Sequence, residues 1–279
     1  MKFWQLIHTQ RALLAFALVL GMAACGGDDD DDDTNGDVNT ADELAPGNIP
    51  DKVTAVEGPE LSAQDAQAAL DLSTLPSITS SDGQAGAAIA QGQAVVSQFG
   101  TVFTYAGASS APAYSPQGEQ ISSITYNGVT IKYIWSDAGD RYSFRSTLSG
   151  TSTASNVTFN DDVWYEAEVL KNRRSGRVQM NYGTYMDVYA SAQGSDYDGE
   201  YLGYYIIEES GKIAIVWDSN ISSTVNNSQT ATSEYQGSVI VEADKSGQAE
   251  WEYDVNAAGQ SYSGSGCSKW DTAGSVSDC

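Results

Sequence analysis

The feature that most constrains the fold of this chain is a turn that recurs at nearly constant spacing. Polar turn sequences with a glycine occur at Gly139, Gly176, Gly211 and Gly247, so the spacings are 37, 35 and 36 residues. A run that alternates between apolar and polar residues follows each turn, as in KIAIVW and QAEWEY. Successive strands without intervening helices favour an antiparallel up-and-down meander.

A second hairpin signal precedes the first of these turns. Asn127-Gly128 lies between ISSITY and VTIKYIWS, and Asn-Gly between two such runs is typical of a tight β-hairpin. Counting the flanking runs gives roughly eight to ten strands, a number at which an open sheet curls or closes. We therefore expect a mainly β domain over residues 101–279, built as a curled sheet or a barrel.

Residues 61–100 differ in composition from the rest of the chain. They are rich in alanine and glutamine, and apolar residues recur at helical spacing in 82–99. The residues expected to share one face of this helix are Ala88, Ile89, Val95, Val96 and Phe99. We expect a small helical segment that packs on the sheet or fills its opening.

The first 24 residues form a targeting segment. Lys2 and Arg11 precede an apolar run, residues 12–22. This run is too short to span a bilayer and has the length of a signal-peptide core. The run ends in Met-Ala-Ala followed by Cys25. This sequence resembles a lipobox, the processing signal of bacterial lipoproteins. The resemblance implies that residues 1–24 are removed and that Cys25 carries the lipid anchor.

The cysteine count agrees with this interpretation. The chain has three cysteines, and lipidation of Cys25 leaves Cys267 and Cys279 as a pair. Exported compartments are oxidising. We therefore predict a disulfide between Cys267 and Cys279 that fixes the C-terminus.

Residues 25–60 are expected to form the lipidated cysteine and a disordered, acidic tether. Six consecutive aspartates, Asp28 to Asp33, repel one another, and apolar residues are sparse. Gly26 follows the anchor, so no aspartate stands where it would retain a lipoprotein in the inner membrane. The acidic run also resembles the export signal of surface-exposed lipoproteins in some Gram-negative lineages, which implies an outer-membrane location on the cell surface or the periplasmic face.

Charge and histidine content exclude several functions. The formal net charge is −24, and such a surface repels nucleic acid phosphates. The only histidine, His8, lies in the leader. The mature protein therefore lacks histidine-dependent triads and histidine-ligated metal sites. We expect no nucleic-acid partner, no cofactor and no enzymatic activity.

Two clusters are candidate binding residues. Asp196, Asp198 and Glu200 alternate around a glycine, a spacing that partly matches a calcium-binding loop; the alternative is a polar turn. The second cluster gathers the basic side chains of one expected hairpin tip, which can contact an anion or a partner or balance local acids and block edge pairing. Its members are Lys171, Arg173, Arg174 and Arg177.

Carboxylates and aromatic residues supply further hypotheses. Two groups of carboxylates each share one strand face: Glu166 with Glu168, and the acids at 250, 252 and 254. A carboxylate pair can catalyse glycoside hydrolysis. The alternative is that these are ordinary outward-facing residues. Sixteen tyrosines and six tryptophans either pack inward or line a carbohydrate or apolar ligand site.

The complete layout resembles a loose group of uncharacterised bacterial lipoproteins. The shared features are the lipobox, the acidic linker, the alanine-rich helix and hairpins such as YEAEVLKNRRSGRVQMNY. The resemblance implies no known activity. We expect an outer-membrane or cell-surface lipoprotein that acts as a non-catalytic binding or envelope-interaction module; the alternative is a lipocalin-like periplasmic carrier of an apolar ligand.

Overall fold

A computed structural model describes most of the chain beyond residue 37. The described residues are 38–75, 83–106, 120–153, 155–189, 196–225, 229–257 and 259–279. Residues 1–37, which include the predicted leader, Cys25 and the aspartate run, lie outside them, so the predictions that concern these residues remain predictions.

The described residues form an antiparallel up-and-down sheet of 11 strands, in which the spatial order equals the chain order from β1 to β11. The mainly β prediction is confirmed. The sheet is an open one with β1 and β11 at its edges, and it does not close into a barrel. The strands are β1 (Gln120–Tyr126), β2 (Val129–Asp137), β3 (Arg141–Thr151), β4 (Thr158–Leu170), β5 (Ser175–Asn181), β6 (Asp196–Ile207), β7 (Ile213–Val225), β8 (Gln229–Val241), β9 (Gly247–Ala257), β10 (Gln260–Trp270) and β11 (Val276–Asp278).

Local sequence explains why the strands turn where they do. Asn127 and Gly128, between β1 and β2, both have positive φ angles, 49° and 81°, as the turn of a two-residue hairpin requires. The recurrent turns separate β2 from β3, β4 from β5, β6 from β7 and β8 from β9. Gly176 and Gly247 are exceptions, because they lie within β5 and at the start of β9 and not in the turns.

Helices precede and interrupt the sheet. The segment expected to be helical forms α2 (Ala63–Ala69), a 3-10 turn η1 (Leu72–Thr74) and α3 (Gly83–Ala106). The prediction is confirmed in kind, but α3 extends past residue 100, so the expected start of the β domain at 101 is wrong. A short helix, α4 (Tyr182–Tyr189), follows β5 and was not predicted.

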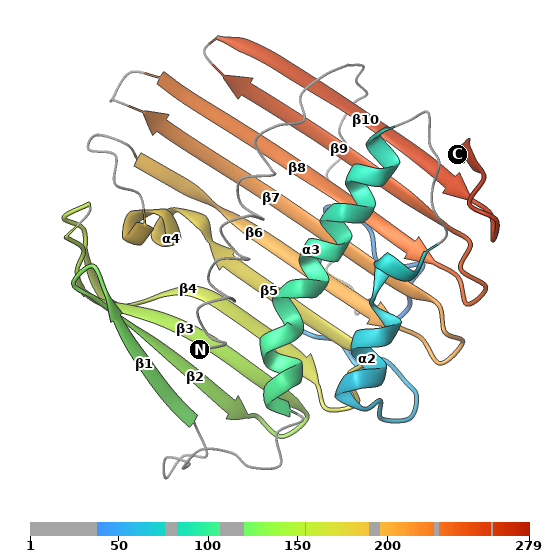
Figure 1. Ribbon diagram of the computed structural model, residues 1–279, viewed down its shortest axis with the longest axis horizontal. Coiled ribbons are helices and arrows are strands. Elements are labelled where there is room, and N and C mark those ends of the chain that lie inside the picture. The colour runs from blue at the N-terminus through green and yellow to red at the C-terminus, as the bar shows by residue number, and fades with distance from the viewer. Residues whose placement is uncertain are drawn as a thin grey trace.

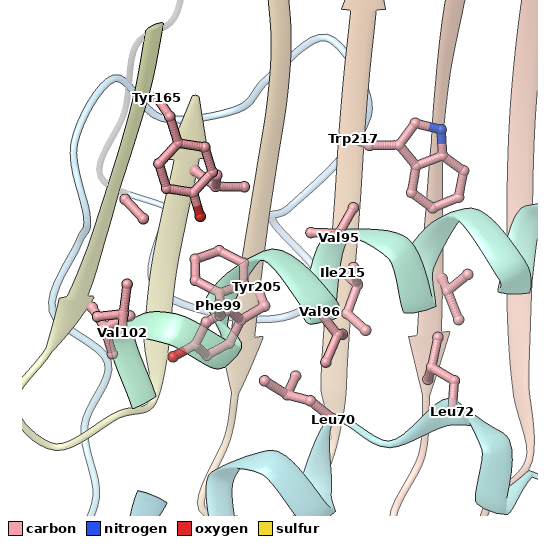
Figure 2. Packing of buried hydrophobic residues seen from close by; sticks show 14 of the residues in the cluster. Leu70, Leu72, Val95, Val96, Phe99, Val102, Tyr165, Tyr205, Ile215 and Trp217 are labelled. Atoms are coloured by element: carbon pink, nitrogen blue, oxygen red, sulfur yellow. The ribbon is translucent and has the colours of Figure 1, made fainter. Parts of the chain in front are cut away.

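Helix α3 lies across one face of the sheet, which we call the front face (Figure 1). Its fully buried side chains include Val95 and Phe99, which point toward β5, β6 and β7 in Figure 2. The Phe99 and Tyr205 rings meet edge to face, with centroids 4.8 Å apart. Burial of a side chain such as Phe99 stabilises the fold by about 1.5–3 kcal/mol, so α3 supplies much of the core on this face.

Several aromatic side chains of the front face lie over a glycine of the neighbouring strand. Trp217 is the cross-strand partner of Gly237, and Trp251 is the partner of Gly266. A Cβ on Gly237 or on Gly266 would lie 2.4 Å from the indole ring. The absence of a side chain at these positions lets the two indole rings lie close to the sheet.

The opposite face, which we call the back face, is covered in part by residues 38–61. We call this segment the strap; it is drawn in blue behind the sheet in Figure 1. Val38, Leu44 and Val56 of the strap are buried in a second core with Tyr204 and Val216. The prediction of a disordered tether reaching residue 60 is therefore wrong for residues 38–60. The strap folds because β6 and β7 carry apolar side chains on both faces, and those on the back require cover.

Candidate functional site

The predicted basic cluster lies at the β4–β5 hairpin, where two of its members hold the strap. Arg173 is only 5% exposed, and its Nη1 donates to Glu60 Oε1 at 2.6 Å and to the carbonyl oxygen of Leu61 at 2.9 Å. Arg174 is 4% exposed and donates to the carbonyl oxygens of Pro59 at 2.9 Å and Ile207 at 3.1 Å. Their guanidinium groups thus bind this chain's own backbone, and they are not accessible to an external anion.

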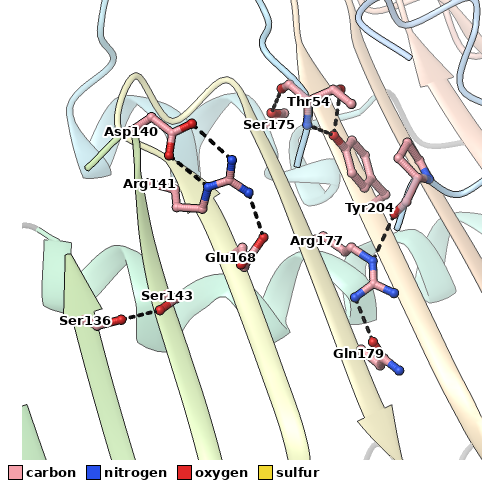
Figure 3. Close-up of polar contacts among 11 residues, drawn as sticks. Thr54, Ser136, Asp140, Arg141, Ser143, Glu168, Ser175, Arg177, Gln179 and Tyr204 are labelled. Carbon is pink, nitrogen blue, oxygen red and sulfur yellow. Dashed lines mark hydrogen bonds and ion pairs between the residues drawn. The ribbon is translucent and has the colours of Figure 1, made fainter. Parts of the chain in front are cut away.

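The other two members lie nearer to solvent. Lys171 pairs with Asp137 at 2.8 Å, and this hydrogen bond raises the pKa of Lys171. Arg177 donates from Nε to the carbonyl oxygen of Pro50 at 3.0 Å and from Nη1 to Gln179 Oε1 at 2.8 Å. Arg177 therefore fixes the middle of the strap on the back face, as Figure 3 shows.

A hydroxyl network fixes the strap next to these arginines. The Tyr204 hydroxyl, on a fully buried ring, accepts from the backbone N–H of Thr54 at 2.8 Å. The Ser175 hydroxyl donates to the carbonyl oxygen of Thr54 at 2.8 Å. Both polar groups of the Thr54 backbone are thus satisfied by the sheet, which determines the register of the strap across β5 and β6.

Beside the strap the back face is hollowed. The hollow has a volume of about 370 Å³. We call it the polar hollow, because most of its lining side chains are polar or charged, and its floor includes Ile134 of β2. Its lining residues are Asp51, Lys52, Ile134, Ser136, Ser143, Phe144, Arg145, Glu166, Ala167, Glu168, Arg177 and Gln179.

The strap and the sheet build the polar hollow jointly. Asp51 and Lys52 come from the strap, and the other lining residues come from β2 to β5. Glu168 is occupied by an ion pair with Arg141 at 3.1 Å, as Figure 3 shows. Cationic, carboxylate and hydroxyl side chains line the same small hollow, so the hollow is suited to binding a polar molecule.

Three charged residues of the polar hollow have no ion-pair or side-chain hydrogen-bond partner among the described residues. Lys52, Arg145 and Glu166 are exposed, and none of them takes part in an ion pair or side-chain hydrogen bond of the described residues. Arg145 and Glu166 are cross-strand neighbours. Sequence reasoning missed Arg145 and Lys52, because nothing in a single strand or in a tether indicates that both line one hollow.

The predicted calcium residues lie along β6 and not in a loop. Asp198 and Glu200 are exposed on the back face. Asp198 accepts from the N–H of Gly199 at 2.8 Å, and Glu200 accepts from Gln179. Within the described ranges, no group of three or more His, Cys, Asp or Glu residues is arranged to hold a metal ion. The polar turn expected as the alternative is wrong, since these residues are in a strand.

Carboxylates on the back faces of β7 to β9 are contacted by amides. Gln236 Nε2 donates to Glu252 at 2.8 Å, and Asn256 Nδ2 donates to Asp254 at 2.9 Å. Asp218 differs, because burial raises its pKa, and the nearby charges of Glu234 and Glu200 raise it further. These contacts describe an acidic, hydrogen-bonded surface.

The C-terminus is closed as predicted. Cys267 and Cys279 form a disulfide, with their Cα atoms 5.4 Å apart, and this bond lies beside the short edge strand β11. A loop of this length is expected to stabilise the fold by about 3 kcal/mol in the chain-entropy account.

Among the described residues, no helix is both long enough and apolar enough to cross a membrane. Comparison of the chain with protein-family models, with curated proteins and with solved structures finds no match.

Proposed function

We propose that this protein is a lipid-anchored, non-catalytic binding module of the bacterial envelope, with Cys25 as its anchor and the polar hollow as its binding site. The observation that carries this proposal is the shared construction of the hollow. One wall belongs to the strap, which continues toward the proposed anchor, and the other walls belong to the sheet.

The length of chain between anchor and domain supports a position close to the membrane. Twelve residues separate Cys25 from Val38, and a fully extended segment of this length reaches at most about 45 Å. The strap begins beside the β6–β7 turn, where Lys212 pairs with Asp42 at 2.6 Å and Glu208 accepts from the N–H of Ala41 at 2.8 Å. The end of the sheet that carries this turn would therefore face the membrane.

The chemistry of the described side chains supports binding in place of catalysis. The chain beyond the leader has no histidine. Of the carboxylates considered for hydrolysis, Glu168 is paired with Arg141, while Glu252 and Asp254 accept from amides. A glycosidase requires one carboxyl group held neutral beside one held ionised, and these three carboxylates are instead engaged in contacts with neighbouring side chains.

The carrier hypothesis gains less support. A carrier of an apolar ligand needs an apolar cavity, but α3 occupies the centre of the front face with Val95 and Phe99 fully buried. A ligand at that position would have to displace the helix. We therefore propose the binding module as the function of this chain.

Mass spectrometry of the native protein and protease treatment of intact cells test this proposal. We expect an acylated Cys25 at the mature N-terminus and digestion of the domain on intact cells, whereas Cys25→Ser should release the protein from the membrane fraction. An unmodified residue 25 would overturn the proposal. Resistance to protease on intact cells, with digestion after the outer membrane is opened, would place the module on the periplasmic face.

A further inference from the structure

We propose that the polar hollow binds a small hydroxylated carboxylate of the sugar-acid class, with Arg145 and Lys52 contacting the carboxylate. This inference rests on the proposed function and specifies the ligand of the same site. It follows from which groups of the hollow are engaged by the protein and which are not.

The two cationic side chains of the hollow without an ion-pair or hydrogen-bond partner among the described residues, Arg145 and Lys52, favour an anionic ligand. The guanidinium of Arg177 is committed to Pro50 and Gln179, and Glu168 is committed to Arg141. Arg145 and Lys52 have no such partner among the described residues. The lowered pKa of Asp161 has its hydrogen bond from Ser149 as the main cause, and Arg145 contributes least. Two cations that line one hollow are suitable contacts for a carboxylate.

The remaining polar groups favour hydroxyls on the same ligand. The hydroxyls of Ser136 and Ser143 lie 2.5 Å apart in a mutual hydrogen bond, and each retains capacity for a further bond. Glu166 is unengaged and can accept from two ligand hydroxyls. A neutral hydroxylated ligand would leave Arg145 and Lys52 unused, and a plain carboxylate would leave the serines and Glu166 unused.

Size and charge narrow the ligand class. A volume of about 370 Å³ is near the lower end of small-molecule sites, so it suits a molecule of about one sugar ring. Asp51, Glu166 and Glu168 also line the hollow, and their charges repel a doubly charged phosphate more strongly than a single carboxylate. Ile134, 9% exposed at the floor, provides a small apolar contact for the ring.

Isothermal titration calorimetry of the full-length protein tests this inference, with glucuronate, glucose, acetate and inorganic phosphate as probes. We expect glucuronate to bind at least about tenfold more tightly than each of the other three, because charge-assisted and hydroxyl hydrogen bonds then act together. Arg145→Met should lower the affinity for glucuronate by about tenfold or more. Lys269→Met, on the back face of β10 and outside the hollow, is the matched control and should leave the affinity unchanged.

The outcomes separate this inference from the proposal on which it rests. Equal affinities for glucose and glucuronate, unchanged binding by a folded Arg145→Met variant, or binding of none of the four probes would each overturn the sugar-acid assignment. None of these results alters the acylation state of Cys25 or the protease accessibility of the domain. An unmodified Cys25 in a protein that binds glucuronate would overturn the anchored module and leave the ligand assignment intact.

Discussion

The two faces of the sheet are covered in different ways. On the front face, α3 contributes alanine, glycine and large apolar side chains, and Phe99 and Val95 contact the sheet through shape and burial alone. On the back face, a segment without regular secondary structure is held through directional bonds from Arg173, Arg174 and Arg177 to its backbone or acidic side chains. An apolar helix satisfies its own backbone and needs mainly a complementary surface, whereas a segment without regular secondary structure needs partners for its backbone carbonyl groups.

The contacts on the two faces therefore have different roles, one in the stability of the fold and the other in the position of the strap. Front-face burial supplies a large part of the folding free energy, whereas back-face bonds determine where the strap lies and therefore the shape of the polar hollow. The three arginines considered as contacts for an external anion bind the strap, and the cations that we propose for a ligand are Arg145 and Lys52.

The largest expected effect comes from emptying the front core. Phe99→Ala removes a fully buried ring that contacts Tyr205 and should lower the free energy of unfolding by about 3–5 kcal/mol. Urea denaturation followed by circular dichroism measures it. Ser97→Ala, at an exposed position of the same helix, should change it by less than about 0.5 kcal/mol. Similar small losses for both variants would show that α3 is not part of the core.

Removal of a back-face arginine comes next. Arg174→Met leaves the carbonyl oxygens of Pro59 and Ile207 without their donor, which should cost about 2–3 kcal/mol in urea denaturation. The control is Lys171→Met, which breaks a more exposed pair with Asp137 and should cost clearly less, because exposed ion pairs contribute little to stability. If Arg174→Met costs no more than this control, the buried guanidinium does not hold the strap.

A smaller effect tests the close approach of ring and strand on the front face. In Gly237→Ala the new Cβ would lie 2.4 Å from Trp217 and 2.6 Å from the carbonyl oxygen of Glu250. We expect a loss of about 1–3 kcal/mol and a shift in tryptophan fluorescence. Gly86→Ala, which meets nothing within 4 Å, should stabilise α3 by up to about 1 kcal/mol. A stabilising effect at both glycines would contradict the packing described here.

The smallest effect concerns pH on the back face. The pKa of Asp218 is raised in the folded state above its ordinary value of 3.8, so the folded protein binds this proton more tightly and stability falls as pH rises through the raised pKa. Asp218→Asn removes a half-buried charge and should stabilise the protein slightly at pH 7, because solvent screens much of the unfavourable interaction. The gain should vanish below pH 3.8, as urea denaturation at several pH values would show.

Asp244 is the matched control for that pH dependence. Its pKa is lowered by hydrogen bonds from Ser246, so its ionised form favours folding and Asp244→Asn should destabilise the protein at pH 7. This loss should disappear as pH falls through the lowered pKa. A stabilising effect of Asp244→Asn, or a pH-independent effect of Asp218→Asn, would contradict the assigned directions.

Local patterns in the sequence predicted the sheet well and its coverings less well. Asn127-Gly128 and the regular turns are short-range signals, and the structure confirms the meander that they indicate. The strap was missed because an acidic, alanine- and proline-containing segment resembles a linker when its partner is unknown. The signal that could have found it is the unbroken apolar character of YYII in β6 and IAIVW in β7, which is typical of strands buried on both faces.

The candidate site was predicted only in part, because its contacts also join residues that are far apart in the sequence. Sequence reasoning placed Arg173 and Arg174 at a hairpin tip, as observed, but their partners lie more than a hundred residues earlier in the chain. Lys52 and Arg145 approach the same hollow only because the strap crosses β5 on the back face. Such contacts follow from tertiary packing, and no local pattern encodes them.

Hydrogen–deuterium exchange of the full-length protein tests the position of the strap most directly. We predict that the amides of Ala41, Thr54 and Leu61, which donate to Glu208, Tyr204 and Asn172, exchange slowly, as amides of the sheet do. Exchange of residues 38–61 at the rate of an unstructured chain would contradict the ordered strap, and with it the shared wall of the polar hollow.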